Sequence, residues 1–172
     1  MKIFNRITVL IILTYSSLAF FSCEQERLED ALEIADGAGT LTSYMAYQLD
    51  SVAGTSDVYG RAVFWKGLEG YTYLQVSLNN VPSDAVYPSA IYAGSITASG
   101  SELMELYTIE NTGEGYDFGE FSTSKYYVIT TDGFYDGLQT YDANIKVMAG
   151  SSDNTIIALG DIGINADPVE TN

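Results

Sequence analysis

Apolar and polar residues alternate along much of the chain after residue 41. The clearest case is "YTYLQVSL" (71–78), where Thr72, Leu74, Val76 and Leu78 would face one side and tyrosine, glutamine and serine the other. This period of two predicts a half-buried antiparallel strand. Strands are also predicted at 42–49, 58–65, 102–109, 115–122, 125–130, 141–148 and 155–160. Glycine- and asparagine-rich turns separate several of them, as is typical of hairpins.

Seven or eight short strands predict an all-β domain over residues 41–164, an antiparallel Greek-key β-sandwich or barrel. The stretch "TDGFYDGLQ" (131–139) interrupts the strands and predicts a loop with one helical turn. "VYPSAIYAGS" (86–95) has a proline inside a strand-like run, which predicts a kinked segment shaped by Pro88 and Gly94. We expect the polar tail, residues 165–172, to fray.

The N-terminal residues have a different character. Lys2 and Arg6 flank the apolar run "ITVLIILTYSSLAFF" (7–21), which is short for a membrane span and predicts a signal peptide over 1–22. Cys23, the one cysteine of the chain, follows at once, and this arrangement resembles a bacterial lipoprotein cleavage site. We therefore expect a lipid on Cys23 that anchors the protein to the membrane, with residues 23–40 as an acidic tether. The alternative is ordinary signal cleavage with Cys23 as a bystander thiol.

Charge and missing residue types narrow the possible functions. The chain has a formal net charge of −16 and no histidine. The acidic surface would repel nucleic acid, so no nucleic-acid partner is expected. Without histidine, and with Cys23 used for lipidation, the usual acid–base, nucleophilic and transition-metal chemistries lose their side chains. The sequence therefore predicts no metal, no cofactor, no catalytic residues and no enzyme.

Carboxylates could still act in pairs or bind calcium. The candidate pairs are Glu102 with Glu105, Asp132 with Asp136, and Asp117 with Glu120. Residues three apart on a strand face opposite sides, so the first pair fits poorly. Asp132, Asp136 or Asp142 could serve calcium, although their spacing is not that of an EF-hand. Solvated turn residues are the simpler interpretation.

The chain has fourteen tyrosines, more than a core requires. Tyr71 and Tyr73 are predicted on the polar face of their strand, and Tyr107, Tyr126 and Tyr127 could add to an exposed patch. Exposed aromatic side chains can bind sugars or protein partners. Pairing of tyrosines across neighbouring strands is the alternative.

Two blocks of sequence resemble the chordin-type (CHRD) domain found on lipoproteins of the Bacteroidota, which is itself similar in architecture to Cu/Zn superoxide dismutase. That family has a His-Pro-x-His-Ile-His-x-Gly motif. Here the frame of the motif persists from residue 87 to Gly94, but Tyr87, Ala90 and Tyr92 replace the three histidines. The second block runs from residue 141 to 150, and "GDIG" (160–163) follows after a turn. Met148 occupies the histidine position of this block. The resemblance implies a Greek-key β domain whose former metal-site positions have lost their ligands.

The expected function is therefore a non-enzymatic, lipid-anchored protein of the cell envelope, in the outer membrane and either periplasmic or surface-exposed. Its CHRD-like domain would have a binding or structural role, with a protein or a glycan as possible partner. A carbohydrate-binding or glycan-handling surface lipoprotein is the alternative. A relic that still binds a ligand beside Tyr87, Tyr92 and Met148 is a third.

Overall fold

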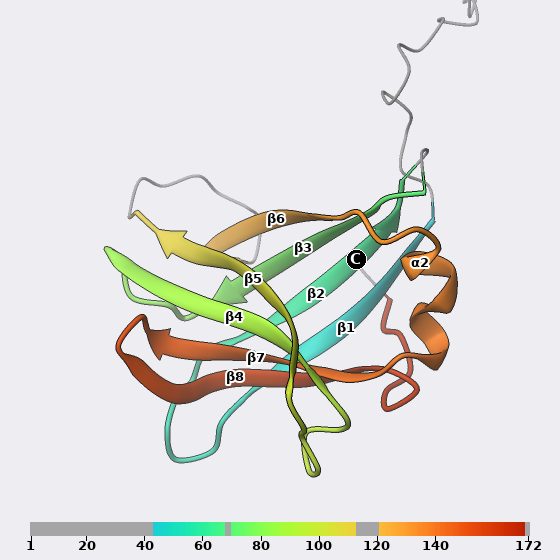
Figure 1. Cartoon of the computed structure of the whole chain (residues 1–172). Coiled ribbons are helices and arrows are strands. Elements are labelled where there is room, and N and C mark those ends of the chain that lie inside the picture. The colour runs from blue at the N-terminus through green and yellow to red at the C-terminus, as the bar shows by residue number, and fades with distance from the viewer. Residues whose placement is uncertain (1–42, 68–69, 113–120, 171–172) are drawn as a thin grey trace, which may run out of the picture. The chain divides into compact units, whose positions relative to one another are not determined.

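A computed structural model describes residues 43–67, 70–112 and 121–170 of the chain (Figure 1). Within these ranges the chain forms eight strands, one short α-helix and one 3-10 helix. They are β1 (Tyr44–Ser51), β2 (Tyr59–Lys66), β3 (Thr72–Asn79), β4 (Ala85–Ala93), β5 (Glu102–Asn111), β6 (Thr123–Ile129), α2 (Phe134–Gly137), η1 (Leu138–Thr140), β7 (Asp142–Gly150) and β8 (Asp153–Gly163). The signal peptide, Cys23, the tether and most of the strand predicted at 115–122 lie outside the described residues.

The strands form one antiparallel sheet in the order β5-β4-β7-β8-β1-β2-β3-β6. Neighbours that are distant in sequence, such as β4 with β7 and β3 with β6, give the connections a Greek-key character. The sheet curls so far that its two edge strands, β5 and β6, approach each other, and the Thr123 hydroxyl donates a hydrogen bond of 2.8 Å to the Glu110 carbonyl across this seam (Figure 1). The predicted all-β fold is confirmed in the form of a nearly closed barrel.

The strand alternation builds the core. On β3, Leu74, Val76 and Leu78 are fully buried, while Tyr73 and Gln75 point outward, as the sequence predicts. Burial of each such apolar side chain contributes roughly 1.5–3 kcal/mol to folding. Large fully buried side chains come from seven of the strands and from η1: Tyr47, Leu49, Phe64, Leu74, Leu78, Ile91, Ile109, Leu138, Ile145 and Ile162.

The segment with the internal proline is a strand in the interior of the sheet, where the sequence predicts only a kinked run. β4 lies between β5 and β7, and its register with β5 shifts between Tyr87 and Ser89. Pro88 falls at that irregularity, and the pairing of β4 with β7 begins only at Ser89. A proline is tolerated inside a sheet at such a bulge, because no ladder hydrogen bond requires its missing N–H.

The helical turn predicted within 131–139 is confirmed by α2 and η1. Together they lie at one end of the barrel, where the Phe134 ring stacks on Phe64 at 6.1 Å between centroids and Leu138 is fully buried (Figure 1).

The expected fraying of the tail is wrong for its described part, because the Val169 amide donates to the Ala46 carbonyl at 2.8 Å beside β1. In the described ranges, no helix has the length and hydropathy needed to cross a membrane.

Candidate functional site

The four positions of the degenerate histidine pattern do not form one site. Tyr87 points into the core, is 3% exposed, and donates a hydrogen bond to the Pro82 carbonyl at 3.3 Å. Ala90 and Tyr92 lie on the opposite, outer face of β4, and Met148 lies on the outer face of β7, four residues from Asn144, which pairs with Tyr92. A common ligand pocket formed by Tyr87, Tyr92 and Met148 is therefore incompatible with the strand geometry.

Tyr92 has partners of its own. The Lys146 ammonium lies 4.5 Å from the centre of the Tyr92 ring, and the Tyr92 hydroxyl donates to a Glu102 carboxylate oxygen at 3.5 Å. Partial burial and, to a lesser degree, the Glu102 carboxylate raise the pKa of the Tyr92 hydroxyl above its usual value. The phenol therefore stays protonated at neutral pH and acts as a hydrogen-bond donor.

The carboxylates proposed to act in pairs have separate roles where the structure describes them. Glu102 pairs with Tyr92 and Glu105 with Ala90, so the expectation that these two glutamates face opposite sides is wrong: a register shift puts both on the outer face. Asp136 forms an ion pair with Lys66 at 2.5 Å. Asp142, which was a candidate for calcium alone, accepts a hydrogen bond from Asn165 at 2.8 Å.

Asp132 lies close to Gly70, whose added Cβ would stand 2.7 Å from a carboxylate oxygen of Asp132. Asp117 and Glu120 lie outside the described residues. Within the described ranges, no three Asp, Glu, His or Cys side chains converge as a metal site would require.

The second sequence block has a structural role that sequence reasoning missed. Asn144 on β7 is fully buried under the loop that joins β4 to β5, and its Nδ2 donates to the Gly94 carbonyl at 2.7 Å and to Ser99 Oγ at 3.2 Å. Asp161 on β8 accepts a hydrogen bond from the Ile96 amide of the same loop at 2.7 Å. The positive φ of Gly94 (75°) starts this loop. Gly94, Asn144 and Asp161 therefore hold a loop in place.

The most prominent exposed feature lies on the outer face of β1, β2, β3 and β6. Strand register aligns Tyr44, Trp65, Tyr73 and Val128 in one row across the four strands. Tyr71 precedes β3 on the same side, and we call Tyr44, Trp65, Tyr71 and Tyr73 the aromatic platform. Its side chains are partly exposed: Tyr44 is 39% and Tyr71 37% accessible, and Trp65 and Tyr73 are less so. The predicted outward orientation of Tyr71 and Tyr73 is confirmed.

The second row on this face is apolar on β1 and β2, where Ala46 and Val63 are buried, and polar on β3 and β6. Gln75 and Tyr126 share the second row, in which Tyr126 is 60% exposed. The third row contains Gln48, Arg61, Ser77 and Ser124. There the Arg61 guanidinium lies over the Phe121 ring at 4.7 Å, and a groove of about 230 Å³ opens. Its walls are Gln48, Tyr59, Gly60, Arg61, Phe121, Val169 and Glu170.

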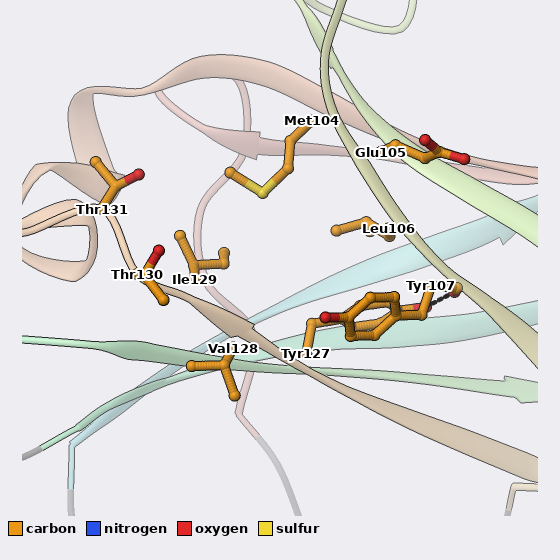
Figure 2. A pocket seen from close by; sticks show the side chains of 9 residues that line it. All are labelled: Met104, Glu105, Leu106, Tyr107, Tyr127, Val128, Ile129, Thr130 and Thr131. Carbon is orange, nitrogen blue, oxygen red and sulfur yellow. Dashed lines mark hydrogen bonds between the residues drawn. The ribbon is translucent and has the colours of Figure 1, made fainter.

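A second groove, of about 200 Å³, follows the seam between β5 and β6 (Figure 2). The Tyr107 and Tyr127 rings stack at 5.4 Å between centroids, and the Tyr127 hydroxyl donates to the Tyr107 carbonyl. Figure 2 shows Met104 and Ile129 reaching toward each other from the two strands. Tyr107 is 66% exposed whereas Tyr127 is buried, so only one of these two predicted patch tyrosines reaches solvent.

Comparison with family models and curated proteins gives no function for these residues. No family model matches the chain, and no curated protein matches it. The resemblance to the CHRD domain remains a prediction from the sequence, and the residues described above are the basis for function.

Proposed function

We propose that this protein is a non-enzymatic, lipid-anchored component of the cell envelope whose β domain binds a partner. The observation that carries the proposal is the aromatic platform with Gln75 and Tyr126 beside it, on one face of the barrel. Exposed aromatic side chains gathered on one surface are typical of interaction sites, since single exposed apolar residues are common but contiguous sets are not. The binding surface would be the outer face of β1, β2, β3 and β6.

The anchor is proposed from the N-terminal sequence. An apolar run of signal-peptide length leads directly to Cys23, and a thioether lipid would explain a lone cysteine in an exported protein. Each buried acyl methylene contributes about 0.8 kcal/mol to membrane binding, so several chains hold a protein stably. The acidic residues that follow Cys23 would keep the β domain away from anionic headgroups.

The absence of enzymatic activity is proposed from residue chemistry. The chain has no histidine, and Cys23 is its one thiol. Of the carboxylates considered for catalysis, Asp136 is engaged in an ion pair with Lys66. A binding role needs none of these groups, whereas general acid–base catalysis would need one positioned beside a substrate.

Two measurements on cells that express the full chain test the proposal. Metabolic labelling with a radioactive fatty acid should mark the wild-type protein and leave Cys23→Ser unlabelled and released from the membrane fraction. Hydroxyl-radical footprinting should then show Tyr44, Trp65 and Tyr71 protected in intact envelopes relative to purified protein, with Tyr107 on β5 as the internal control. Equal modification of the platform in both samples would refute a binding role for this face.

A further inference from the structure

We infer that the ligand of the aromatic platform is a neutral oligosaccharide chain, an inference that rests on the proposed use of this face for binding. The platform offers what such a chain needs: flat apolar surface for the C–H faces of sugar rings, with uncharged hydrogen-bonding groups beside it for the hydroxyls. Binding sites of this kind are mostly apolar with a few placed polar groups.

The extent of the platform suits a chain rather than a single sugar. Tyr44, Trp65 and Tyr73 occupy three adjacent strands, and Val128 continues the row on the fourth. Neighbouring strands lie about 4.8 Å apart, so the row extends over roughly 14 Å. The groove beside Gln48 and Tyr59 opens on the same face, but its walls include Arg61 and Glu170, so the four-strand row alone is the surface proposed for the uncharged chain.

The rings are held in place before any ligand arrives. Tyr44 and Trp65 contact each other at 4.9 Å between centroids, with planes inclined by 47°. The Tyr73 ring lies against Gly67, where an added Cβ would stand 2.8 Å from its Cε2 atom. Gly67 thus leaves the space that the ring occupies. Side chains fixed in this way lose little conformational entropy on binding, which favours affinity for a weakly interacting ligand.

The groups next to the row can hydrogen-bond without charge. Gln75 lies in the row beside the platform, and its Nε2 donates to Ser124 Oγ at 3.3 Å, which fixes the amide. Tyr126 presents an exposed hydroxyl in the same row. A fixed amide and a phenol can donate to and accept from sugar hydroxyls.

Charge decides between ligand classes. None of the platform residues is charged at neutral pH, and the nearby Lys66 is neutralised by Asp136 at 2.5 Å. The chain as a whole carries −16, which disfavours an anionic polysaccharide. A basic peptide would be drawn to carboxylates, which the platform lacks. An uncharged glycan fits this combination best.

Trp65 is the one tryptophan of the chain, so its fluorescence reports directly on the platform. The test uses the full-length protein in a detergent without a sugar headgroup. Neutral gluco-, manno- and xylo-oligosaccharides are titrated against it, with oligogalacturonate of matched length as the anionic comparison. We expect a saturable change in Trp65 emission with at least one neutral series and none with oligogalacturonate.

Two variants locate the site while keeping the reporter. Tyr44→Ala and Tyr73→Ala should each weaken binding about tenfold or more, as loss of a central aromatic contact does. Tyr107→Ala on β5 removes a more exposed tyrosine away from the platform and should bind like the wild type. Circular dichroism and thermal melting establish that each variant is folded.

The inference falls if folded wild-type protein shows no response to any neutral series, if it responds to oligogalacturonate alone, or if Tyr107→Ala weakens binding as much as Tyr73→Ala. Footprinting then separates the two proposals. Protection of the platform in cells without glycan binding would leave the binding role standing with a protein as partner. Absence of both the footprinting protection and the glycan response would refute the binding role as well.

Discussion

Asn144 shows how one amide can hold a loop. Its Nδ2 supplies the hydrogen bond to the Gly94 carbonyl, and the side chain is fully buried. Replacement by aspartate keeps the shape but removes the donor and places a carboxylate against carbonyl oxygens. A buried acceptor left unpaired costs about 1–3 kcal/mol, and an unpaired buried charge adds to that.

We therefore expect Asn144→Asp to lower the free energy of unfolding by roughly 3 kcal/mol or more at neutral pH, measured by urea denaturation. Ser99→Ala is the matched control, because it removes a weaker contact of the same amide at 3.2 Å and leaves the bond to Gly94. It should cost about 1 kcal/mol or less. Similar stability of the two variants would show that Asn144 does not support the loop.

The contribution of Tyr127, which lies at the seam between β5 and β6, to folding stability depends on pH. Burial raises the pKa of its hydroxyl to about 12, and the hydrogen bond with Ser89 lowers it by a smaller amount. The unfolded tyrosine has a pKa near 10.0. Below that pH both states keep the proton. Between about 10 and 12 the unfolded chain loses it while the folded chain retains it, so stability falls as the pH rises.

Tyr127→Phe removes this contribution, which amounts to at most about 2–3 kcal/mol. Because the hydrogen bond of the Tyr127 hydroxyl is lost, the free energy of unfolding of the variant should be about 1 kcal/mol lower at pH 8. Between that pH and pH 12 its free energy of unfolding should fall less steeply than that of the wild type. Burial also raises the pKa of Tyr47 and Tyr87, so the difference between the stability curves of the variant and the wild type is the measured quantity. Tyr126→Phe, at an exposed position on the same strand, should follow the wild-type curve of stability against pH. If the curve of Tyr127→Phe runs parallel to that of the wild type, the pH dependence does not come from Tyr127.

At the scale of the element, β4 shows where a strand accepts a proline. Pro88 lies at the register shift with β5, before pairing with β7 begins. Ala90, two residues later, pairs with Glu105 on one side and Lys146 on the other. A proline at residue 90 would interrupt a continuous ladder.

Ala90→Pro should therefore destabilise the domain by about 3 kcal/mol or more, whereas Pro88→Ala should change stability by less than about 1 kcal/mol. Denaturant midpoints of the two variants provide the comparison. If Pro88→Ala proves as damaging as Ala90→Pro, the bulge does not explain the tolerated proline.

The elements that the sequence predicted well share one property. β3 alternates because one face meets the core and the other meets solvent, so period two is visible in the sequence. β4 was missed as a regular strand because a proline and several small residues hide its alternation. The role of Asn144 was missed for a related reason: a buried polar side chain has no periodic signal, and its partners Gly94 and Ser99 are more than forty positions away.

The arrangement of the whole barrel depends on pairings that no local pattern encodes. β3 pairs with β6 and β8 with β1, each across a long stretch of chain. The aromatic platform arises from this order. Tyr71 and Tyr73 were predictable from their own strand, but Tyr44 and Trp65 join them only through the register of β1, β2 and β3. A candidate site assembled by register therefore becomes visible only in the structure.

The same strand order leaves the barrel open along one line. β5 and β6 are the ends of the sheet, and the seam between them is bridged by the Thr123 hydroxyl on the Glu110 carbonyl and the Tyr127 hydroxyl on the Tyr107 carbonyl. Edge strands carry backbone groups without ladder partners on one side, so their amides exchange with solvent through smaller openings. β7 is paired with β4 and β8, and β8 is paired with β7 along its length and with β1 at Leu159 and Ala158.

Native-state hydrogen exchange should accordingly show faster exchange in β5 and β6 than in β7 and β8. Thr123→Val removes one bridge and nearly preserves volume. We expect it to speed exchange near Glu110 in β5 several-fold while leaving β7 unchanged, because opening of the seam does not require the central strands to separate. Equal protection of all strands in the wild type, or a uniform effect of Thr123→Val, would mean that the barrel opens as one cooperative unit and that the seam is not its weakest line.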